Sequence, residues 1–352
     1  MTRRVLVVRL DGAGDVLLAG PAVRAVAAAP GAEVTLLCGP DGAAAGRLLP
    51  GVRRVLVWAS PWIVAPAPPV TAADVDDIVA RLAAHAFDEA VVLTSFHQSP
   101  LPTALLLRLA GIPRITGASV DYPGSLLDVR LRPGEDLPED IPEPERGLAI
   151  ATAAGFDLPA GDDGRLAVQP PPDVGSLLGG LSGRPYVVLH PGAAVPARRW
   201  PAEHHRSAVR LLAQAGIPAV VTGGAAERDL TAAVAGDEAL DLGGRTDLAQ
   251  LAGVLAGAAA VVVGNTGAAH LAAAVGTPVV SLFAPVVPAV RWRPYRVPHV
   301  LLGDQDAPCR GSRARICPVP GHPCVGRITP EHVVVAVRRL VAAPVPVEEG
   351  SS

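Results

Sequence analysis

Three short stretches of the chain place polar side chains where they suit chemistry on an anionic substrate. In the first, the β-branched run Val261 to Val263 predicts a buried strand, Gly-Asn-Thr-Gly at 264–267 breaks it, and a helix is expected over Ala268 to Val275. The free N–H groups at the start of a helix stabilise an anion, and the polar side chains offered beside them are Asn265, Thr266 and His270. The alternative is a plain strand-to-helix turn in which Thr266 only caps the helix.

The second stretch, residues 10–15, contains the carboxylate of Asp15. It follows the expected strand Arg4 to Arg9 and precedes a helix expected over Val16 to Ala29. A carboxylate at a helix start either caps the helix, where the dipole favours it, or acts as a general base at the end of the sheet. Gly12 and Gly14 resemble the beginning of a dinucleotide fingerprint, but Leu17 stands where the third glycine would be, so binding of NAD is not indicated.

The third stretch holds Arg198 and Arg199, between an expected strand over Tyr186 to His190 and a helix that runs to Ala215. Two arginines beside a helix N-terminus suit a diphosphate, and the alternative is two solvated loop cations. Further along, Glu227 is expected in the first turn of a helix, where it accepts hydrogen bonds from a ribose or interacts with the helix dipole.

The elements that position these groups alternate between strand and helix along almost the whole chain. This alternation predicts an α/β protein with two doubly wound, Rossmann-like halves of parallel sheet facing a cleft, the GT-B architecture. We expect the halves to span residues 1–170 and 171–342, joined through a Gly-, Pro- and Asp-rich linker over 159–183 and followed by a disordered tail at 343–352. The Pro- and acid-rich residues 121–144 are expected to form loops.

Composition excludes several classes of protein. Half of the 352 residues are hydrophobic, so the chain is not disordered, and a net charge of -3 with 3% aromatic residues argues against nucleic-acid partners. The apolar, uncharged stretch 251–290 is interrupted by polar residues and prolines, which favours strands and a helix over a membrane span. We therefore expect a cytoplasmic protein, with peripheral contact at the inner face of the membrane left open.

Three of the four cysteines lie close together near the C-terminus. Cys309, Cys317 and Cys324 are separated by seven to eight positions and accompanied by His322, with no C-x-x-C pair. This spacing is a poor zinc pattern, so structural thiols or a disulfide are expected in place of a metal site.

Four segments together resemble glycosyltransferase family 9, the lipopolysaccharide heptosyltransferases. They are VLVVRLDGAGDVLLAGPAV, HPGAAVPARRWP, LGGRTDLAQLAGVLAGA and VVVGNTGAAHLAAAVGTPVVSLFAP, and their order spans nearly the whole chain. The resemblance implies an inverting, metal-independent glycosyltransferase without a cofactor. Its donor would be a nucleotide sugar, with ADP-heptose as the family expectation, and its acceptor a lipopolysaccharide core or another lipid-linked or cell-envelope glycan.

The same resemblance implies roles for individual residues. Asp15 takes the position of the catalytic base, on an acceptor-side loop with Gly12 and Gly14. Arg198 matches a basic residue, commonly Lys, that contacts the donor with Arg199 beside it, and Thr266, Gly267 and Ala268 contact its diphosphate. His270 matches the histidine of the motif, and Glu227 and Thr246 lie near positions that hold the nucleoside. Asn265 stands where the family usually has Asp, which leaves the identity of the donor sugar open.

Two alternatives to a transferase remain at this point. One is a nucleotide-sugar-binding protein of the same architecture that has lost catalysis, which the exchange to Asn265 keeps open. The other is a sugar-nucleotide epimerase, which needs no acceptor; the Gly-Asp motif that ends in Asp15 favours the transferase over both.

Overall fold

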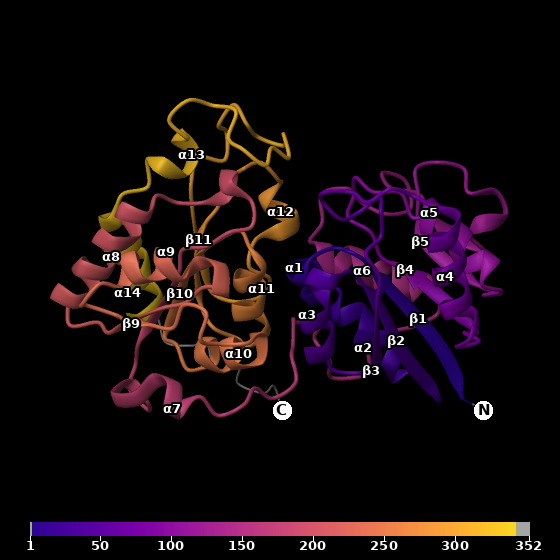
Figure 1. Cartoon of the computed structure of the whole chain (residues 1–352), viewed down its shortest axis with the longest axis horizontal. Coiled ribbons are helices and arrows are strands. Elements are labelled where there is room, and N and C mark those ends of the chain that lie inside the picture. The colour runs from indigo at the N-terminus through magenta and orange to yellow at the C-terminus, as the bar shows by residue number, and fades with distance from the viewer. Residues whose placement is uncertain (1, 343–352) are drawn as a thin grey trace. The chain divides into compact units, whose positions relative to one another are not determined.

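The computed structural model describes residues 2–342, so the tail at 343–352 lies outside the described residues (Figure 1). The chain divides into two compact units. Unit 1 comprises the chain up to Pro170 together with Val290–Tyr295, and unit 2 comprises Pro171–Ala289 and the chain from Arg296 onward. The short segment 290–295 therefore joins unit 1 although it lies more than a hundred residues beyond the division at Pro170.

Unit 1 is built on a six-stranded parallel sheet with the order β3-β2-β1-β4-β5-β6. Chain order reverses between β1 and β4, so the loops that leave these two neighbouring strands flank the switch point where α/β sheets bind ligands. The strands are β1 (Arg3–Arg9), β2 (Ala32–Cys38), β3 (Val52–Val57), β4 (Glu89–Val92), β5 (Ile115–Ala118) and β6 (Val129–Leu131).

The helix expected over 16–29 is wrong in its extent, because two helices occupy this region. The chain becomes helical already at Ala13, and the helix breaks at Ala19. Pro21 explains the break, since it has no N–H to donate to the carbonyl of Leu17 and its ring crowds that carbonyl. The α-helices of unit 1 are α1 (Ala13–Leu18), α2 (Gly20–Ala28), α3 (Ala43–Leu48), α4 (Ala72–Ala83), α5 (Leu101–Leu109) and α6 (Glu143–Ala153), and α12 (Ala289–Trp292) begins at the unit boundary.

The expectation of loops over 121–144 is also wrong in part. Val129–Leu131 forms β6, which pairs in parallel with β5, and Gly124–Leu126 forms a 3₁₀ turn. A three-residue strand at the edge of a sheet is too short to show an apolar alternation, so Pro and acidic neighbours hide it in the sequence.

Unit 2 repeats the topology of unit 1 with the order β12-β11-β10-β7-β8-β9, all parallel, and its switch point lies between β7 and β10. The strands are β7 (Val187–His190), β8 (Ala219–Val221), β9 (Leu240–Asp241), β10 (Ala260–Gly264), β11 (Val279–Leu282) and β12 (His299–Leu302). The α-helices are α7 (Gly175–Leu178), α8 (Ala202–Gln214), α9 (Arg228–Ala235), α10 (Leu248–Ala256), α11 (Gly267–Ala274), α13 (Pro323–Gly326) and α14 (Pro330–Ala342).

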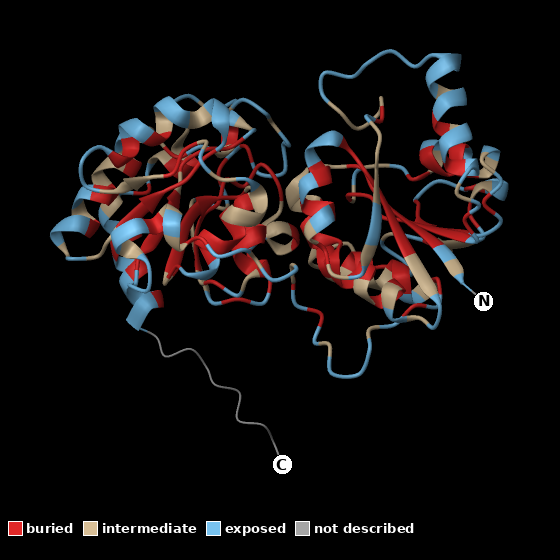
Figure 2. Ribbon diagram, turned by 60° about the horizontal axis from the view of Figure 1, so that its bottom comes forward, coloured by how far each residue is buried: buried red, intermediate tan, exposed pale blue. Residues whose placement is uncertain are grey.

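The central strands explain why each sheet is covered on both faces. Val5 to Val8 in β1 and Ala260 to Val263 in β10 are apolar at every position and at most 1% exposed. A strand that is apolar on both sides needs helices on both faces of its sheet, which is the doubly wound arrangement. Figure 2 shows these buried strands at the centre of each unit, with exposed residues on the outer sides of the helices.

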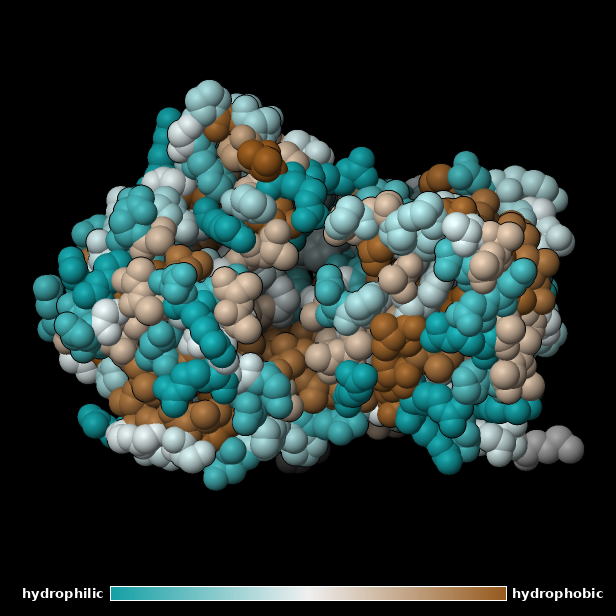
Figure 3. Space-filling model, in the orientation of Figure 1, coloured by the Kyte–Doolittle hydropathy of each residue, from teal (hydrophilic) through white to brown (hydrophobic). Residues whose placement is uncertain are grey.

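The face of the protein drawn in Figure 3 carries hydrophilic side chains interspersed with hydrophobic patches. Among residues 2–342, no helix combines the length and apolar character that crossing a bilayer requires.

Candidate active site

In unit 1, Asp15 lies at the switch point and is the third residue of α1. Its Oδ1 accepts hydrogen bonds from Arg9 Nη2 at 2.8 Å and from Trp292 Nε1 at 3.2 Å. The side chain is 28% exposed, and its Oδ2 accepts no hydrogen bond from any residue in the described part of the chain. Asp15 makes no capping bond, since the N-cap is Gly12. The carboxylate thus has one anchored oxygen and one open oxygen.

Arg9, the last residue of β1, organises the charged groups around Asp15. It is 3% exposed, and its guanidinium also contacts Asp11 at 2.9 Å, Glu143 at 3.4 Å and the hydroxyl of Ser95 at 2.8 Å. Burial opposes the charge of Arg9, but these neighbouring carboxylates outweigh that effect and raise its pKa above the ordinary value. Arg9 is therefore a permanent, fixed cation between β1, the loop after β4 and α6.

Asp11 is a second carboxylate at the same edge, and both of its oxygens are engaged. Oδ1 accepts a hydrogen bond from Gln98 at 2.6 Å, and Oδ2 pairs with Arg9 at 2.9 Å. Burial raises the pKa of Asp11, and the neighbouring Asp15 raises it further, while Arg9 and Gln98 oppose this. Asp11 is more enclosed than Asp15, with 12% of its side chain exposed, so Asp15 is the better placed of the two to meet a substrate.

The segment 290–295 brings Trp292 to this site. Arg291 is 3% exposed, pairs with Glu139 and Glu143, and its guanidinium lies 4.2 Å from the ring centre of Phe96. The rings of Trp292 and Phe96 are 5.8 Å apart. Ion pairs and ring contacts thus fix the segment on unit 1 and hold the Trp292 indole in place over Asp15.

The two glycines of the acceptor-side loop differ in their surroundings. A Cβ added to Gly12 would meet nothing within 4 Å, so open space adjoins the start of α1. Gly14 lies within α1, next to Asp15.

In unit 2, the loop between β10 and α11 forms the corresponding edge. Thr266 is the N-cap of α11 by position, but its side chain makes no capping hydrogen bond. The expectation that the Thr266 side chain caps the helix is therefore wrong. Its buried Oγ1 has no hydrogen-bond partner among the described residues. The first N–H groups of the helix, those of Gly267 and Ala268, have no preceding carbonyl within the helix to bind.

Arg198 lies beside this loop. It belongs to a 3₁₀ turn, Pro196–Arg198, and its Nη1 donates a hydrogen bond to the carbonyl of Asn265 at 3.2 Å. The turn passes so close to Gly264 that a Cβ there would stand 2.9 Å from the Arg198 carbonyl. The structure therefore brings Arg198 together with the start of α11, next to Thr266.

The side chain of Asn265 is engaged within the protein. It is 3% exposed, and its two amide atoms bind the backbone N–H and carbonyl of Ala284, each at 3.4 Å. His270, in the first turns of α11, is likewise buried, with 4% exposed. The Asn265 amide thus ties the loop before α11 to the residues that follow β11.

Arg199 and Thr246 lie in two other parts of unit 2, next to the Arg198 turn and after β9. The Arg199 Nε donates to the carbonyl of Ala193 in its own loop at 2.8 Å. Thr246 follows β9, the edge strand two positions from β7, and the cap of the next helix is Asp247, whose side chain accepts from the N–H of Gln250.

Glu227 forms a capping bond, accepting from the N–H of Gly224 at 2.8 Å, and lies over the loop that follows β7. A Cβ on Gly192 would clash with the Glu227 carboxylate, so the carboxylate lies directly against this glycine. His190, at the end of β7, bonds Thr222 at 3.0 Å; burial lowers its pKa, and Glu227 opposes this.

The cysteine-rich loop packs against the turn that holds Arg198. Within residues 2–342, no three metal-ligating side chains are arranged to bind an ion, and Cys309, Cys317 and Cys324 are free thiols. Burial, with Cys309 as neighbour, raises the pKa of Cys324 to about 12. The expectation of structural thiols is therefore correct and that of a disulfide is wrong.

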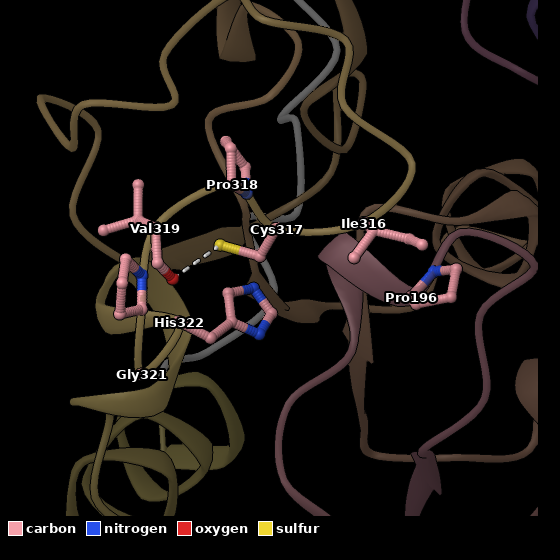
Figure 4. A pocket seen from close by; sticks show the side chains of 8 residues that line it. Pro196, Ile316, Cys317, Pro318, Val319, Gly321 and His322 are labelled. Atoms are coloured by element: carbon pink, nitrogen blue, oxygen red, sulfur yellow. Dashed lines mark hydrogen bonds between the residues drawn. The ribbon is translucent and has the colours of Figure 1, made fainter.

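Backbone contacts join this loop to the turn of Arg198. His322 Nε2 binds the carbonyl of Ala197 at 3.0 Å, and the N–H of Ala197 donates to Arg315 at 3.0 Å. Figure 4 shows the pocket of about 510 Å³ beside this contact, with Cys317 directed to the carbonyl of Val319. The loop thus supports the position of Arg198 from the outside.

Sequence reasoning missed several members of the unit 1 site. A buried arginine at the end of an apolar strand was the available signal for Arg9, since burial of its charge requires carboxylates nearby. No local pattern reveals Trp292, which lies 277 positions from Asp15. Glu143 and Ser95 likewise depend on tertiary contacts.

Two doubly wound units, each with polar groups at its switch point, define the class of protein as α/β with two Rossmann-like domains of the GT-B type. The chain belongs to glycosyltransferase family 9 (heptosyltransferase), whose family model matches residues 77–321.

Curated relatives agree with the family. Lipopolysaccharide heptosyltransferase 2 of Escherichia coli (strain K12) is 31% identical over 225 residues, which are 57% of this chain and 61% of that protein. Lipopolysaccharide heptosyltransferase 1 of Pseudomonas aeruginosa is 31% identical over 178 residues, which are 46% of this chain and 50% of that protein. The matches therefore span about half to three fifths of these relatives.

Solved structures share the fold over nearly the whole chain. The E. coli ADP-heptose lipopolysaccharide heptosyltransferase II has a TM-score of 0.70 at 22% identity, covering 96% of this chain and 98% of that one. A family 9 glycosyl transferase from Veillonella parvula has a TM-score of 0.76 at 18% identity, covering 96% and 97%. The predicted fold class is confirmed.

Proposed function

We propose that this protein is an inverting, metal-independent glycosyltransferase that moves a sugar from a nucleotide donor to a cell-envelope glycan. The observation that carries the proposal is the state of Asp15, which is held by one oxygen and open at the other. A carboxylate in this state is suited to take the proton of an acceptor hydroxyl.

The donor site is proposed at the start of α11 in unit 2. The N–H groups of Gly267 and Ala268, the Thr266 hydroxyl and the guanidinium of Arg198 provide donors for a diphosphate without any metal ion. Structures of the E. coli heptosyltransferase WaaC contain ADP and ADP-2-deoxy-2-fluoro heptose, which supports an ADP-linked heptose as the donor. Glu227, beside the loop after β7, would accept hydrogen bonds from the ribose.

The proposed reaction is a single displacement. Asp15 Oδ2 accepts the proton of the acceptor hydroxyl while the hydroxyl oxygen attacks the anomeric carbon from the face opposite the nucleotide. The bond from that carbon to the diphosphate breaks, and the negative charge that develops on the departing ADP is stabilised by Arg198 and the helix N–H groups. Attack from the opposite face inverts the configuration at the anomeric carbon.

The acceptor is proposed to be the lipopolysaccharide core or another lipid-linked glycan, bound beside Asp15. The open space next to Gly12 adjoins the proposed base, and the curated relatives are named for lipopolysaccharide. Because such acceptors are held in a membrane, we propose peripheral contact of the protein with the cytoplasmic face.

Transfer from ADP-heptose to a purified core oligosaccharide, followed by NMR of the product's anomeric proton, tests this proposal. The expected product has the configuration opposite to that of the donor. A product with the donor's configuration would contradict the single displacement, and hydrolysis of ADP-heptose without transfer would contradict the acceptor class.

A further inference from the structure

We propose that Arg9 and Trp292 are positioning residues that hold Asp15 by a single carboxylate oxygen, so that the other oxygen faces the acceptor. This inference rests on the proposed function of Asp15 as the base. Both hydrogen bonds to Asp15, from Arg9 Nη2 at 2.8 Å and Trp292 Nε1 at 3.2 Å, end on the same atom, Oδ1.

Two donors on one oxygen restrict the rotation of a carboxylate. A carboxylate with a single contact can turn about its last torsion angle and exchange its two oxygens. With donors from two directions on Oδ1, Oδ2 is left in one orientation. Geometry of this kind matters for catalysis because a displacement of about 1 Å costs on the order of 100-fold in rate.

Arg9 is held in place by residues other than Asp15. Asp11, Glu143 and Ser95 surround its guanidinium, and only 3% of the residue is exposed. Its position is therefore set by β1, the loop after β4 and α6 together. An arginine with several partners in a closed site has little freedom to follow a moving carboxylate. Arg9 and Trp292 together form a clamp on Asp15, and Arg9 is its rigid half.

Trp292 is the half of the clamp supplied from far along the chain. The segment 290–295 lies between two stretches assigned to unit 2, yet it is anchored on unit 1 through Arg291 and Tyr295. Tyr295 donates a hydrogen bond to Glu145 at 3.1 Å, so the segment is held on both sides of Trp292. A segment that lies between two stretches of unit 2 in the sequence, but belongs to unit 1, thereby contributes to the surroundings of the proposed base.

Trp292→Phe tests the clamp with the smallest change, because it keeps an aromatic ring beside Phe96 and removes the N–H. We expect kcat for transfer from ADP-heptose to fall about tenfold while KM for ADP-heptose stays within twofold. The matched control is Trp62→Phe, which removes an indole N–H that donates to Thr103 at 3.3 Å elsewhere in unit 1 and leaves kcat unchanged. A kcat for Trp292→Phe equal to that of this control would overturn the proposal.

A double-mutant cycle separates positioning from a general structural role. In single-turnover reactions of Asp15→Ala, the added Trp292→Phe change is expected to alter the rate by less than twofold, because the group that the indole orients is gone. A tenfold effect in both backgrounds would show that Trp292 does not act through Asp15. Full activity of Asp15→Ala alone would instead refute Asp15 as the base, which is a failure of the proposed function.

An NMR measurement covers the case in which Trp292→Phe does not fold. The chain has four tryptophans, so the ¹⁵N-labelled protein gives four indole N–H signals. The Trp292 signal is expected to shift strongly in Asp15→Ala while the signals of Trp58, Trp62 and Trp200 stay in place. An unmoved Trp292 signal would refute the hydrogen bond independently of any activity.

Discussion

The two units share one topology and differ in the chemistry at their switch points. In unit 1, the edge between β1 and β4 is filled with charged side chains that pair with one another, centred on Arg9. In unit 2, the edge between β7 and β10 offers helix N–H groups, the guanidinium of Arg198, and a Thr266 hydroxyl that no described residue hydrogen-bonds. The same sheet topology thus supports a proposed base in unit 1 and a proposed anion site in unit 2.

Asp15→Asn is the strongest test of the proposed base in unit 1. We expect turnover to fall by about two orders of magnitude or more, because an amide cannot take the acceptor proton, while ADP affinity is retained. Steady-state transfer assays and calorimetric titration with ADP measure the two quantities. Asp76→Asn, which makes the same change on an exposed helix face, serves as the control. Near-normal turnover of Asp15→Asn would show that Asp15 is not the base.

Arg198→Gln tests the cationic part of the edge in unit 2. The Kd for ADP is expected to rise about 10- to 100-fold, since a charge-assisted contact to a phosphate is lost. Arg199→Gln is the matched control, because Arg199 binds the Ala193 carbonyl in its own loop, and its expected change is below threefold. Equal effects of the two substitutions on the Kd for ADP would contradict the proposal that Arg198, and not Arg199, contacts the diphosphate.

His205→Phe tests a buried titratable group of unit 2 that folding keeps neutral, in contrast to the charged Arg9 of unit 1. Burial, together with the neighbouring His190 and His204, lowers the pKa of His205 from 6.5 to about 3. The neutral form is thus favoured by folding, so this stabilisation is complete above pH 6.5 and is lost as the pH falls toward 3.

Relative to the Phe variant, wild type should lose about 1.4 kcal/mol of unfolding free energy per pH unit in that window. Urea unfolding of both proteins at several pH values measures this difference. Parallel pH profiles would contradict a neutral buried His205.

Thr266→Val has the smallest expected effect. It should keep or raise the stability of the fold and weaken the binding of ADP. The buried Thr266 hydroxyl has no partner within residues 2–342, so its removal should leave the unfolding free energy unchanged or raise it by up to about 1 kcal/mol. The Kd for ADP, in contrast, should rise about fivefold. Thr277→Val is the matched control, because the Thr277 hydroxyl donates to Leu255 at 2.8 Å, and its loss should destabilise the fold by about 1 kcal/mol without changing ADP affinity. Chemical unfolding and calorimetry check both signs, and destabilisation by Thr266→Val would show that its hydroxyl serves the fold.

Much of the fold was predictable because its strongest signals are local. The apolar runs at β1 and β10 and the glycine after each of them predict strand, loop and helix in the right order. The break at Ala19 and the strand Val129–Leu131 were missed, since a proline effect within a helix and a three-residue edge strand leave little periodicity.

For the candidate sites, the sequence predicted the loops that carry the site residues but not the contacts of these residues. Asp15, Arg198 and Thr266 stand beside glycines or helix starts, and these local features pointed to them. The partners of these residues, such as Arg9 and Trp292, come from burial and from contacts across hundreds of positions, which no local pattern encodes. The side chain of Asn265 was expected near the donor, but its contacts with Ala284 depend on how β11 ends.

A crystal structure of the protein with ADP would test most directly whether the diphosphate binds at the sheet edge of unit 2 and not at that of unit 1. We expect diphosphate oxygens within hydrogen-bond distance of the Gly267 and Ala268 N–H groups, the Thr266 hydroxyl and the Arg198 guanidinium. Diphosphate bound at the unit 1 edge beside Arg9, with the start of α11 empty, would contradict it.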